Sequence, residues 1–246
     1  CVDPQGCQEP GLAYKGFAED IAYSRRWRGA IISTPCDDDA WCGSQYFQVK
    51  KENGTHYWSL YLSVFCWCIP ADAVLFEHPL TILVPMWRQS HQLVHPYYFG
   101  ADDDGRCLKK TTLLWLRGWK LVRATNVMQG TPVDHKHAIK DFDPVSRTQR
   151  RSDFTWNMAE ALVDQCNPDT IIEGAVQPDL AVELIILADN YAKKYGAAAL
   201  PFGHSNMQGL FPPVVNYSPS QMHRKQIRAD AEAACARPTP MWPPTR

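Results

Sequence analysis

The chain has 246 residues, 45% of them hydrophobic and 21% charged, and its formal net charge is −1. This composition is typical of a protein with a packed core, large enough for one α/β domain with an extension or for two small domains. It excludes a membrane span, because the longest apolar stretch, residues 57–75, is interrupted by two serines, a proline and an aspartate.

The first half of the chain carries a strand, a helix and a second strand in succession. Gly29–Thr34 is a short, apolar, β-branched run that predicts a buried strand. Tyr57–Ile69 is apolar almost all round and is stopped by Pro70, which predicts a buried helix. Ala73–Phe76 predicts a second buried strand. Two strands that are apolar throughout, joined by a helix, are typical of parallel βαβ structure, so an α/β fold is expected.

Later segments predict two more strands and two more helices. The first of these helices has Ser152 or Asp153 as its N-cap, and the second is capped by Asp179 and closed by Gly196. Residues 201–246 contain eight prolines, so this tail is expected to wrap around the domain or to lack regular structure in part. The expected elements are strands over Leu93–Phe99 and Thr111–Leu116, a polar loop over residues 124–150, and helices over Phe154–Cys166 and Asp179–Tyr195.

The nine cysteines do not have the spacing of a disulfide framework. We therefore expect mostly buried free thiols in an intracellular, reducing compartment. Two short patterns come nearest to zinc-ligand spacing. Cys66 and Cys68 lie in the apolar helix, which favours core packing, and His135 and His137 lie in a polar loop, which favours solvation. The sequence therefore predicts no metal site.

Charge is distributed unevenly along the chain. Residues 1–104 carry 13 acidic and 7 basic residues, whereas residues 105–151 carry 11 basic and 3 acidic ones. A basic block beside an acidic half is the pattern expected when one face of a protein meets phosphates. A solvated basic surface explains the same charges equally well.

Candidate chemistry lies at the ends of the two apolar strands. Pro35 and Cys36 follow the first strand, and Glu77, His78 and Pro79 follow the second. In a parallel sheet, ligands bind beyond the carboxyl ends of the strands, so a thiol and a carboxyl group are expected to face one crevice. A thiolate is a nucleophile, and a carboxylic acid opposite it can bind a ring nitrogen of a substrate.

The order of several short motifs resembles a compact phage branch of the cytosine-5 DNA methyltransferases. That branch typically reads Pro-Pro-Cys, Glu-Asn-Pro, Gln-Pro-aromatic-x-Phe-Gly, Lys-x-Thr-x-Leu-Trp-Leu-x-Gly, Pro-Thr-Asn, and Arg-Ser-x-Thr-Phe before a helix with Met-Ala-Glu. The match covers residues 29–166 in order and approximate spacing, and its most distinctive part is the strand that ends at Gly118. The corresponding segments here are Thr34–Cys36, Glu77–Pro79, His95–Gly100, Lys110–Gly118, Ala124–Asn126, Arg151–Phe154 and Met158–Glu160.

The resemblance implies a Rossmann-like methyltransferase sheet with helices on both faces, and a mechanism. Cys36 would add to carbon 6 of a cytosine flipped out of DNA, and Glu77 would bind the ring at N3. Carbon 5 would then accept a methyl group from S-adenosylmethionine. Arg117 or Arg151 would bind the base carbonyl or a phosphate. The basic block would lie against DNA through Lys109, Lys110, Lys120, Arg123, Arg147 and Arg150.

The resemblance assigns the methyl donor to Asp3 and Pro35, with Asp3 at the end of the second family strand. The glycine-rich turn that such enzymes place after their first strand would then lie before residue 1, so the chain as given is expected not to bind S-adenosylmethionine tightly. His78 replaces the usual asparagine. Three aspartates, Asp37–Asp39, follow the nucleophile where the family is neutral, and they are expected to raise the pKa of the thiol.

These departures leave two main interpretations open. The chain is either an active DNA methyltransferase or a catalytically degenerate homologue that serves as a structural or nucleic-acid-binding subunit; another nucleotide-modifying enzyme on the same fold is a third. Residues 1–166 are expected to form the methyltransferase-like domain, and residues 167–246 a helical, proline-rich extension that packs against a protein partner.

Overall fold

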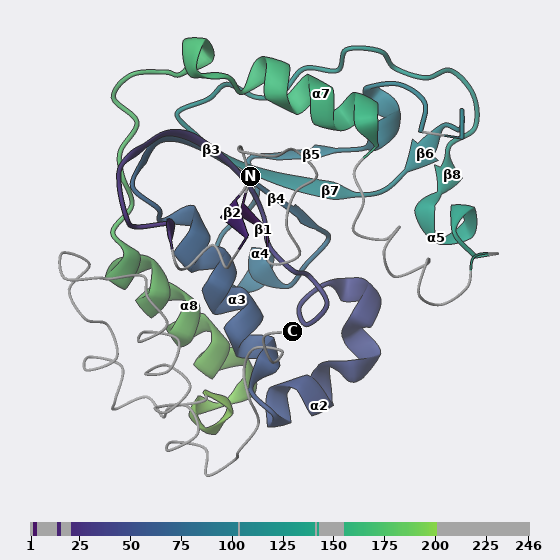
Figure 1. Ribbon diagram of the computed structural model, residues 1–246. Coiled ribbons are helices and arrows are strands. Elements are labelled where there is room, and N and C mark those ends of the chain that lie inside the picture. The colour runs from purple at the N-terminus through teal and green to yellow at the C-terminus, as the bar shows by residue number, and fades with distance from the viewer. Residues whose placement is uncertain are drawn as a thin grey trace.

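The computed structural model describes residues 2–3, 14–15, 21–102, 104–140, 142 and 155–200 (Figure 1). It is a mixed α/β structure. Its central sheet has the strand order β3-β4-β7-β5. These strands span Trp27–Ser33 (β3), Ala71–Pro79 (β4), Thr112–Arg117 (β7) and Gln92–Val94 (β5). Strand β4 is parallel to β3, and β7 is antiparallel to both β4 and β5.

The expected strand–helix–strand unit is confirmed. Helix α3 (Thr55–Trp67) connects the parallel strands β3 and β4, and eleven of its thirteen residues are buried. It begins after Gly54, which has a left-handed φ of 82°, and it ends at Trp67, with Cys68 as its C-cap two residues before Pro70. A helix that is apolar all round fits this position, because it is covered by the sheet on one side and by another helix on the other.

Helices cover both faces of the sheet. Helices α3, α4 (Leu83–Met86) and α8 (Leu180–Tyr195) share one hydrophobic core with one face, and α7 (Trp156–Gln165) shares a second core with the other (Figure 1). Side chains alternate between these cores along each strand, as a β-pleat requires. Along β4, Val74 and Phe76 face α3, whereas Ala73 and Leu75 face α7.

Helix α8 follows the sequence-based expectation closely. The side chain of Asp179 accepts hydrogen bonds from the backbone N–H groups of Ala181 and Val182, and Gly196 ends the helix with a φ of 87°. Its apolar side packs in the same core as α3. The described part of the expected C-terminal extension is therefore joined to the core of the α/β layer, and residues 201–246 lie outside the described residues.

Three local expectations need correction. The strand expected over Leu93–Phe99 ends at Val94, because Pro96 opens the 3-10 helix η2 (Pro96–Tyr98). The N-cap position of α7 is Thr155, whose side chain makes no capping hydrogen bond, while Ser152 and Asp153 lie outside the described residues. The expected polar loop includes β8 (Val133–Asp134) and α5 (His135–Ala138).

The remaining elements are short. They are β1 (Val2–Asp3), β2 (Tyr14–Lys15), η1 (Trp41–Tyr46), α2 (Phe47–Glu52), β6 (Leu108–Lys109), η3 (Pro168–Thr170) and η4 (Ala197–Ala199).

Candidate active site

The ends of β3 and β4 bring Cys36 and Glu77 to the same edge of the sheet. Ser33 is the register partner of Glu77 in the parallel pair, and Cys36 follows three residues later. The hydroxyl of Ser33 donates a 2.8 Å hydrogen bond to the Glu77 carboxyl group, which is 3% exposed. Because Glu77 lies two residues after Leu75, it points to the α7 face of the sheet.

Burial sets the protonation of Glu77. It raises the pKa of the carboxyl group, while the charge of Lys110 and the hydrogen bond from Ser33 act in the opposite direction. Glu77 therefore keeps its proton to a higher pH than an ordinary glutamate. In this form the group is a hydrogen-bond donor, which is what an unprotonated ring nitrogen requires.

The charge of Lys110 acts on both the carboxyl group and the thiol. Lys110 lies two residues before Thr112, which pairs with Pro79 at the carboxyl end of β4. Its positive charge lowers the pKa of both Cys36 and Glu77. The sequence placed Lys110 among the DNA-contacting residues, whereas the structure sets its charge close enough to act on both groups of the candidate site.

The surroundings of the Cys36 thiol oppose thiolate formation. Cys36 is partly buried, and its pKa is raised to about 12, first by burial and then by Asp37, Asp39 and Cys42. The opposing effect of Lys110 is smaller. At neutral pH the thiolate is therefore a small fraction of the population, and Cys36 is a weak nucleophile until a bound substrate or a structural change removes part of this penalty.

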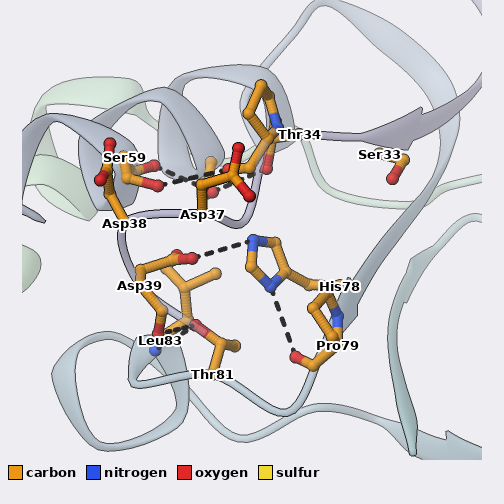
Figure 2. A network of polar contacts seen from close by, with 12 residues as sticks. Ser33, Thr34, Asp37, Asp38, Asp39, Ser59, His78, Pro79, Thr81 and Leu83 are labelled. Carbon is orange, nitrogen blue, oxygen red and sulfur yellow. Dashed lines mark hydrogen bonds and ion pairs between the residues drawn. The ribbon is translucent and has the colours of Figure 1, made fainter. Parts of the chain in front are cut away.

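Of the three aspartates that follow Cys36 in the sequence, Asp39 is buried and not exposed to solvent. Asp39 and His78 are both fully buried, and His78 Nε2 lies 3.5 Å from Asp39 Oδ1 (Figure 2). On its other side the His78 ring faces the carbonyl oxygen of Pro79, 3.4 Å from Nδ1. Burial raises the pKa of Asp39 and lowers that of His78 to about 4, so both side chains are driven toward their neutral forms.

Backbone contacts hold the Cys36 loop against the segment after β4. The carbonyl oxygen of Asp39 accepts 3.2 Å hydrogen bonds from the Thr81 hydroxyl and from the N–H of Ile82. Ala40 pairs with Thr81 in an isolated β-bridge. Lys50 lies on the outer side of the loop, where it contacts the carbonyl oxygen of Asp37 and the carboxylate of Asp38. The loop is thus fixed at several points within a few residues of the thiol.

Arg117 does not join this site. Its register partner is Val74, three residues along β4 from Glu77, which corresponds to roughly 10 Å along the strand. Its side chain also lies on the α3 face, where it donates a 3.0 Å hydrogen bond to the carbonyl oxygen of Ile69. The expectation that Arg117 binds the target base is corrected on this geometry, because β7 runs antiparallel to β4 and carries Arg117 to the opposite end of the sheet.

The other expected site residues are spread along the chain. Lys109 is exposed in β6, and Lys120 and Arg123 are exposed after β7. The N–H of Arg123 donates to the side chain of Gln165, which ties this segment to α7. Pro35 is exposed, and its carbonyl oxygen accepts a 3.3 Å hydrogen bond from Ser59. Arg147, Arg150 and Arg151 lie outside the described residues, as does the side chain of Asp3.

Two residues, Asp3 and Pro35, are expected from the resemblance to bind the methyl donor. Of the two expected donor-binding residues, only Pro35 has a described side chain, and it offers no charged or hydrogen-bonding group. The two residues that the resemblance assigns to S-adenosylmethionine therefore contribute no described charged or hydrogen-bonding side chain. Within the described residues, no group of three histidine, cysteine or acidic side chains is placed to hold a metal ion.

Sequence reasoning missed the role of Ser33 and the buried contact between Asp39 and His78. Ser33 could have been found, because in-register parallel strands place Ser33 and Glu77 on one face. Neither the burial of Asp39 nor its contact with His78 has a local signal, since both depend on how two loops dock.

Comparison with known proteins gives no identification. No protein-family model matches the chain, and no match is found among curated proteins or solved structures. In the part of the chain that the structure describes, no helix has both the length and the apolar character to cross a membrane.

Proposed function

We propose that this chain is a cytosine-5 DNA methyltransferase-like protein on a Rossmann-like sheet, with Cys36 and Glu77 around the target base. The observation that carries the proposal is the parallel pairing of β3 and β4, whose carboxyl ends lie side by side. It places a cysteine after one strand and a buried glutamate with a raised pKa at the end of the next. The sequence resemblance names the same two residues.

The chemistry of the two groups is complementary. The thiolate of Cys36 would form a bond from Sγ to carbon 6 of cytosine, and the electron pair of the 5,6 double bond would move into the ring. The proton of Glu77, shared with N3, would neutralise the charge that develops there. Carbon 5 would then be nucleophilic and would accept the methyl group. Loss of the carbon 5 proton to a base would return the electron pair to the 5,6 double bond, break the bond between Sγ and carbon 6, and release Cys36 as thiolate. Lys110 would assist the first step, because its charge favours the thiolate.

The remaining parts of the proposal concern partners. S-adenosylmethionine would supply the methyl group. DNA would be held by electrostatic contact with the basic block, of which Lys109, Lys120 and Arg123 are exposed. Residues 167–246 would contact a protein partner. An intracellular, reducing compartment would keep the thiols free.

A second candidate is a degenerate homologue that binds nucleic acid without methyl transfer. The observation that favours it is the thiol itself, since Asp37 and Asp39 add to the effect of burial and raise its pKa to about 12. The position of Arg117 also favours the degenerate homologue, because Arg117 lies away from Glu77 and cannot bind a base held there. In this case Cys36 would be a packing residue, and Glu77 would retain only a binding or structural role.

One experiment separates the two candidates without the methyl donor. Reversible addition of a thiolate to carbon 6 makes carbon 5 exchange its hydrogen with solvent. We therefore expect deuterium to enter cytosine in duplex DNA incubated with the full chain in heavy water, as measured by mass spectrometry. The expected rate is low at pH 7 and rises with pH, because the thiolate fraction rises.

The matched variants are Cys36→Ser and Cys42→Ser. Cys42 is an exposed cysteine six residues away. Exchange should be lost in Cys36→Ser and kept in Cys42→Ser. DNA binding without exchange at any pH would favour the degenerate homologue, and the absence of both exchange and DNA binding would refute the proposal.

A further inference from the structure

Two arginine side chains and a histidine ring lie around Trp67 at the end of the sheet opposite Glu77. The guanidinium carbon of Arg117 lies 5.5 Å from the Trp67 ring centroid, and that of Arg88 lies 5.9 Å from it. The ring of His91 is stacked near Trp67, with centroids 6.2 Å apart. Three elements contribute: Trp67 ends α3, Arg117 ends β7, and Arg88 and His91 precede β5.

Several hydrogen-bond donors of this group have no acceptor. They are buried and without a partner at Nε and Nη1 of Arg117, at Nε of Arg88 and at Nε1 of Trp67. Arg117 is 8% exposed, and its described hydrogen bond uses only Nη2. Buried donors without an acceptor are rare in folded proteins, so four of them, one on the Trp67 ring and three on the two arginines beside it, call for an explanation.

The charges of the group are not balanced. Arg88 is paired with Glu183, whose other oxygen accepts a 2.7 Å hydrogen bond from Trp87. Among the described residues, no carboxylate lies within 4 Å of Arg117, although nearby Arg26 is paired with Asp72 at 2.7 Å. Cys68 faces Arg117, but burial raises the pKa of that thiol and keeps it neutral. An arginine stays charged at any ordinary pH, so Arg117 is a buried cation without a counter-charge.

We propose that Trp67, Arg88 and Arg117 form a binding site for a small oxyanion. A guanidinium group presents its N–H donors in a planar fork that matches the oxygens of a phosphate or a carboxylate. Such a ligand would accept from the free donors and neutralise Arg117, whereas a water molecule would satisfy donors but supply no charge. His91 is exposed and the Arg88 side chain is 34% exposed, which marks the side from which the ion enters.

This site is separate from the candidate active site. Arg117 and Glu77 lie on opposite faces and at opposite ends of the sheet, so the inference holds whether or not Cys36 is a nucleophile. Since α3, β7 and the segment after α4 all contribute to the site, an anion bound there would link three elements of the core.

The test is the thermal stability of the full chain in inorganic phosphate, compared with chloride at equal ionic strength. We expect phosphate to raise the unfolding midpoint by about 5 °C when its concentration is well above its dissociation constant. Arg117→Met should remove this rise. Arg28→Met is the matched control, because it makes the same change at an exposed arginine outside the proposed DNA-binding surface, and the rise should persist.

A second measurement covers the case in which Arg117→Met does not fold. Arg117→Lys keeps the charge but loses the planar fork, and calorimetric titration should show phosphate binding at least tenfold weaker than in the parent chain. Acetate in place of phosphate shows whether a carboxylate is the preferred ligand. A midpoint that does not rise in phosphate or acetate, or that rises equally in Arg117→Met, would overturn the assignment.

Discussion

His78 Nε2 lies 3.5 Å from Asp39 Oδ1, and no part of either side chain is exposed to solvent. The residue after Glu77 thus contacts the third residue after Cys36, so the two segments that carry the candidate chemistry are joined behind the site. The first prediction follows from this contact. Asp39→Ala removes a fully buried side chain beside His78 and opens a small cavity, and it should lower the free energy of unfolding by about 2 kcal/mol.

The control for this change is Asp38→Ala. Asp38 is next in the chain, pairs with Lys50 at 3.3 Å, and has a side chain that is 37% exposed. Its loss should cost less than about 1 kcal/mol. Chemical denaturation of both variants measures the two values, and equal costs would show that the buried contact contributes nothing to stability.

The second prediction is a pH dependence of the same pair. The pKa of His78 is lowered to about 4, so its contribution to stability is present above its unfolded pKa of about 6.5 and is lost as the pH falls toward 4. The pKa of Asp39 is raised, so its contribution is present at low pH and is lost as the pH rises through the folded pKa.

Between about pH 4 and 6.5 the two effects oppose each other, because deprotonation of His78 in the unfolded chain favours folding as the pH rises, whereas ionisation of the buried Asp39 disfavours it. The stability of the parent chain should therefore change less across this range than that of a variant in which only His78 titrates. Asp39→Asn removes the carboxyl titration, so its stability should instead rise from pH 4 to 6.5 and then level off. Unfolding free energies at several pH values test this, and parallel profiles would contradict the assigned protonation.

The third prediction concerns the aspartates around the thiol. Asp37 is second to burial among the causes that raise the pKa of Cys36, whereas Asp38 is not among the named causes. Asp37→Asn should therefore increase the rate at which iodoacetamide alkylates Cys36 at pH 8, by about threefold for half a pKa unit. Asp38→Asn should leave the rate unchanged. Peptide mass spectrometry follows each cysteine separately, and identical rates in the two variants would remove the electrostatic explanation.

Lys110 provides the opposite test. Its charge favours the thiolate of Cys36 and the ionised form of Glu77, so Lys110→Met should slow alkylation of Cys36 severalfold. The neighbouring Lys109 is exposed in β6 and serves as the control through Lys109→Met. If Lys110 were only a phosphate contact, both variants would weaken DNA binding alike and neither would change the thiol.

The parallel strands and their crossover helix could be predicted because their signal is local. Gly29–Thr34 and Ala73–Phe76 are unbroken apolar runs, and a stop at Pro70 fixes the helix between them. The position of Arg117 could not be predicted in the same way. Its motif shows that a strand is present, but the direction of that strand depends on pairing with β4, and antiparallel pairing moves Arg117 away from Glu77.

The burial of Asp39 was hidden for a similar reason. Three consecutive aspartates favour a solvated loop, and two of them conform, since Asp37 is exposed and Asp38 is partly exposed. Asp39 differs because the loop docks on Thr81 and Ile82, which carries its side chain toward His78. That docking is a long-range event with no pattern in the loop itself.

The last prediction explains a glycine in the most distinctive motif of the chain. Gly118 follows β7 with a φ of 72°, and a Cβ atom at this position would lie 2.5 Å from the carbonyl oxygen of Asp72 and 2.8 Å from Cβ of Ala73. Any side chain therefore meets both backbone strain and overlap with the start of β4. Gly118→Ala should cost about 3 kcal/mol or more in unfolding free energy.

Gly130→Ala separates the two contributions. Gly130 also has a positive φ, 121°, but a Cβ atom there would have no neighbour within 4 Å. Its substitution carries the strain alone and should cost about 1–2 kcal/mol. The difference between the two variants, measured by denaturant unfolding, isolates the close approach of β7 to β4. If Gly118→Ala were no more destabilising than Gly130→Ala, this glycine would be needed only for its backbone conformation, and the packing of the strand end against Asp72 and Ala73 would be looser than the structure shows.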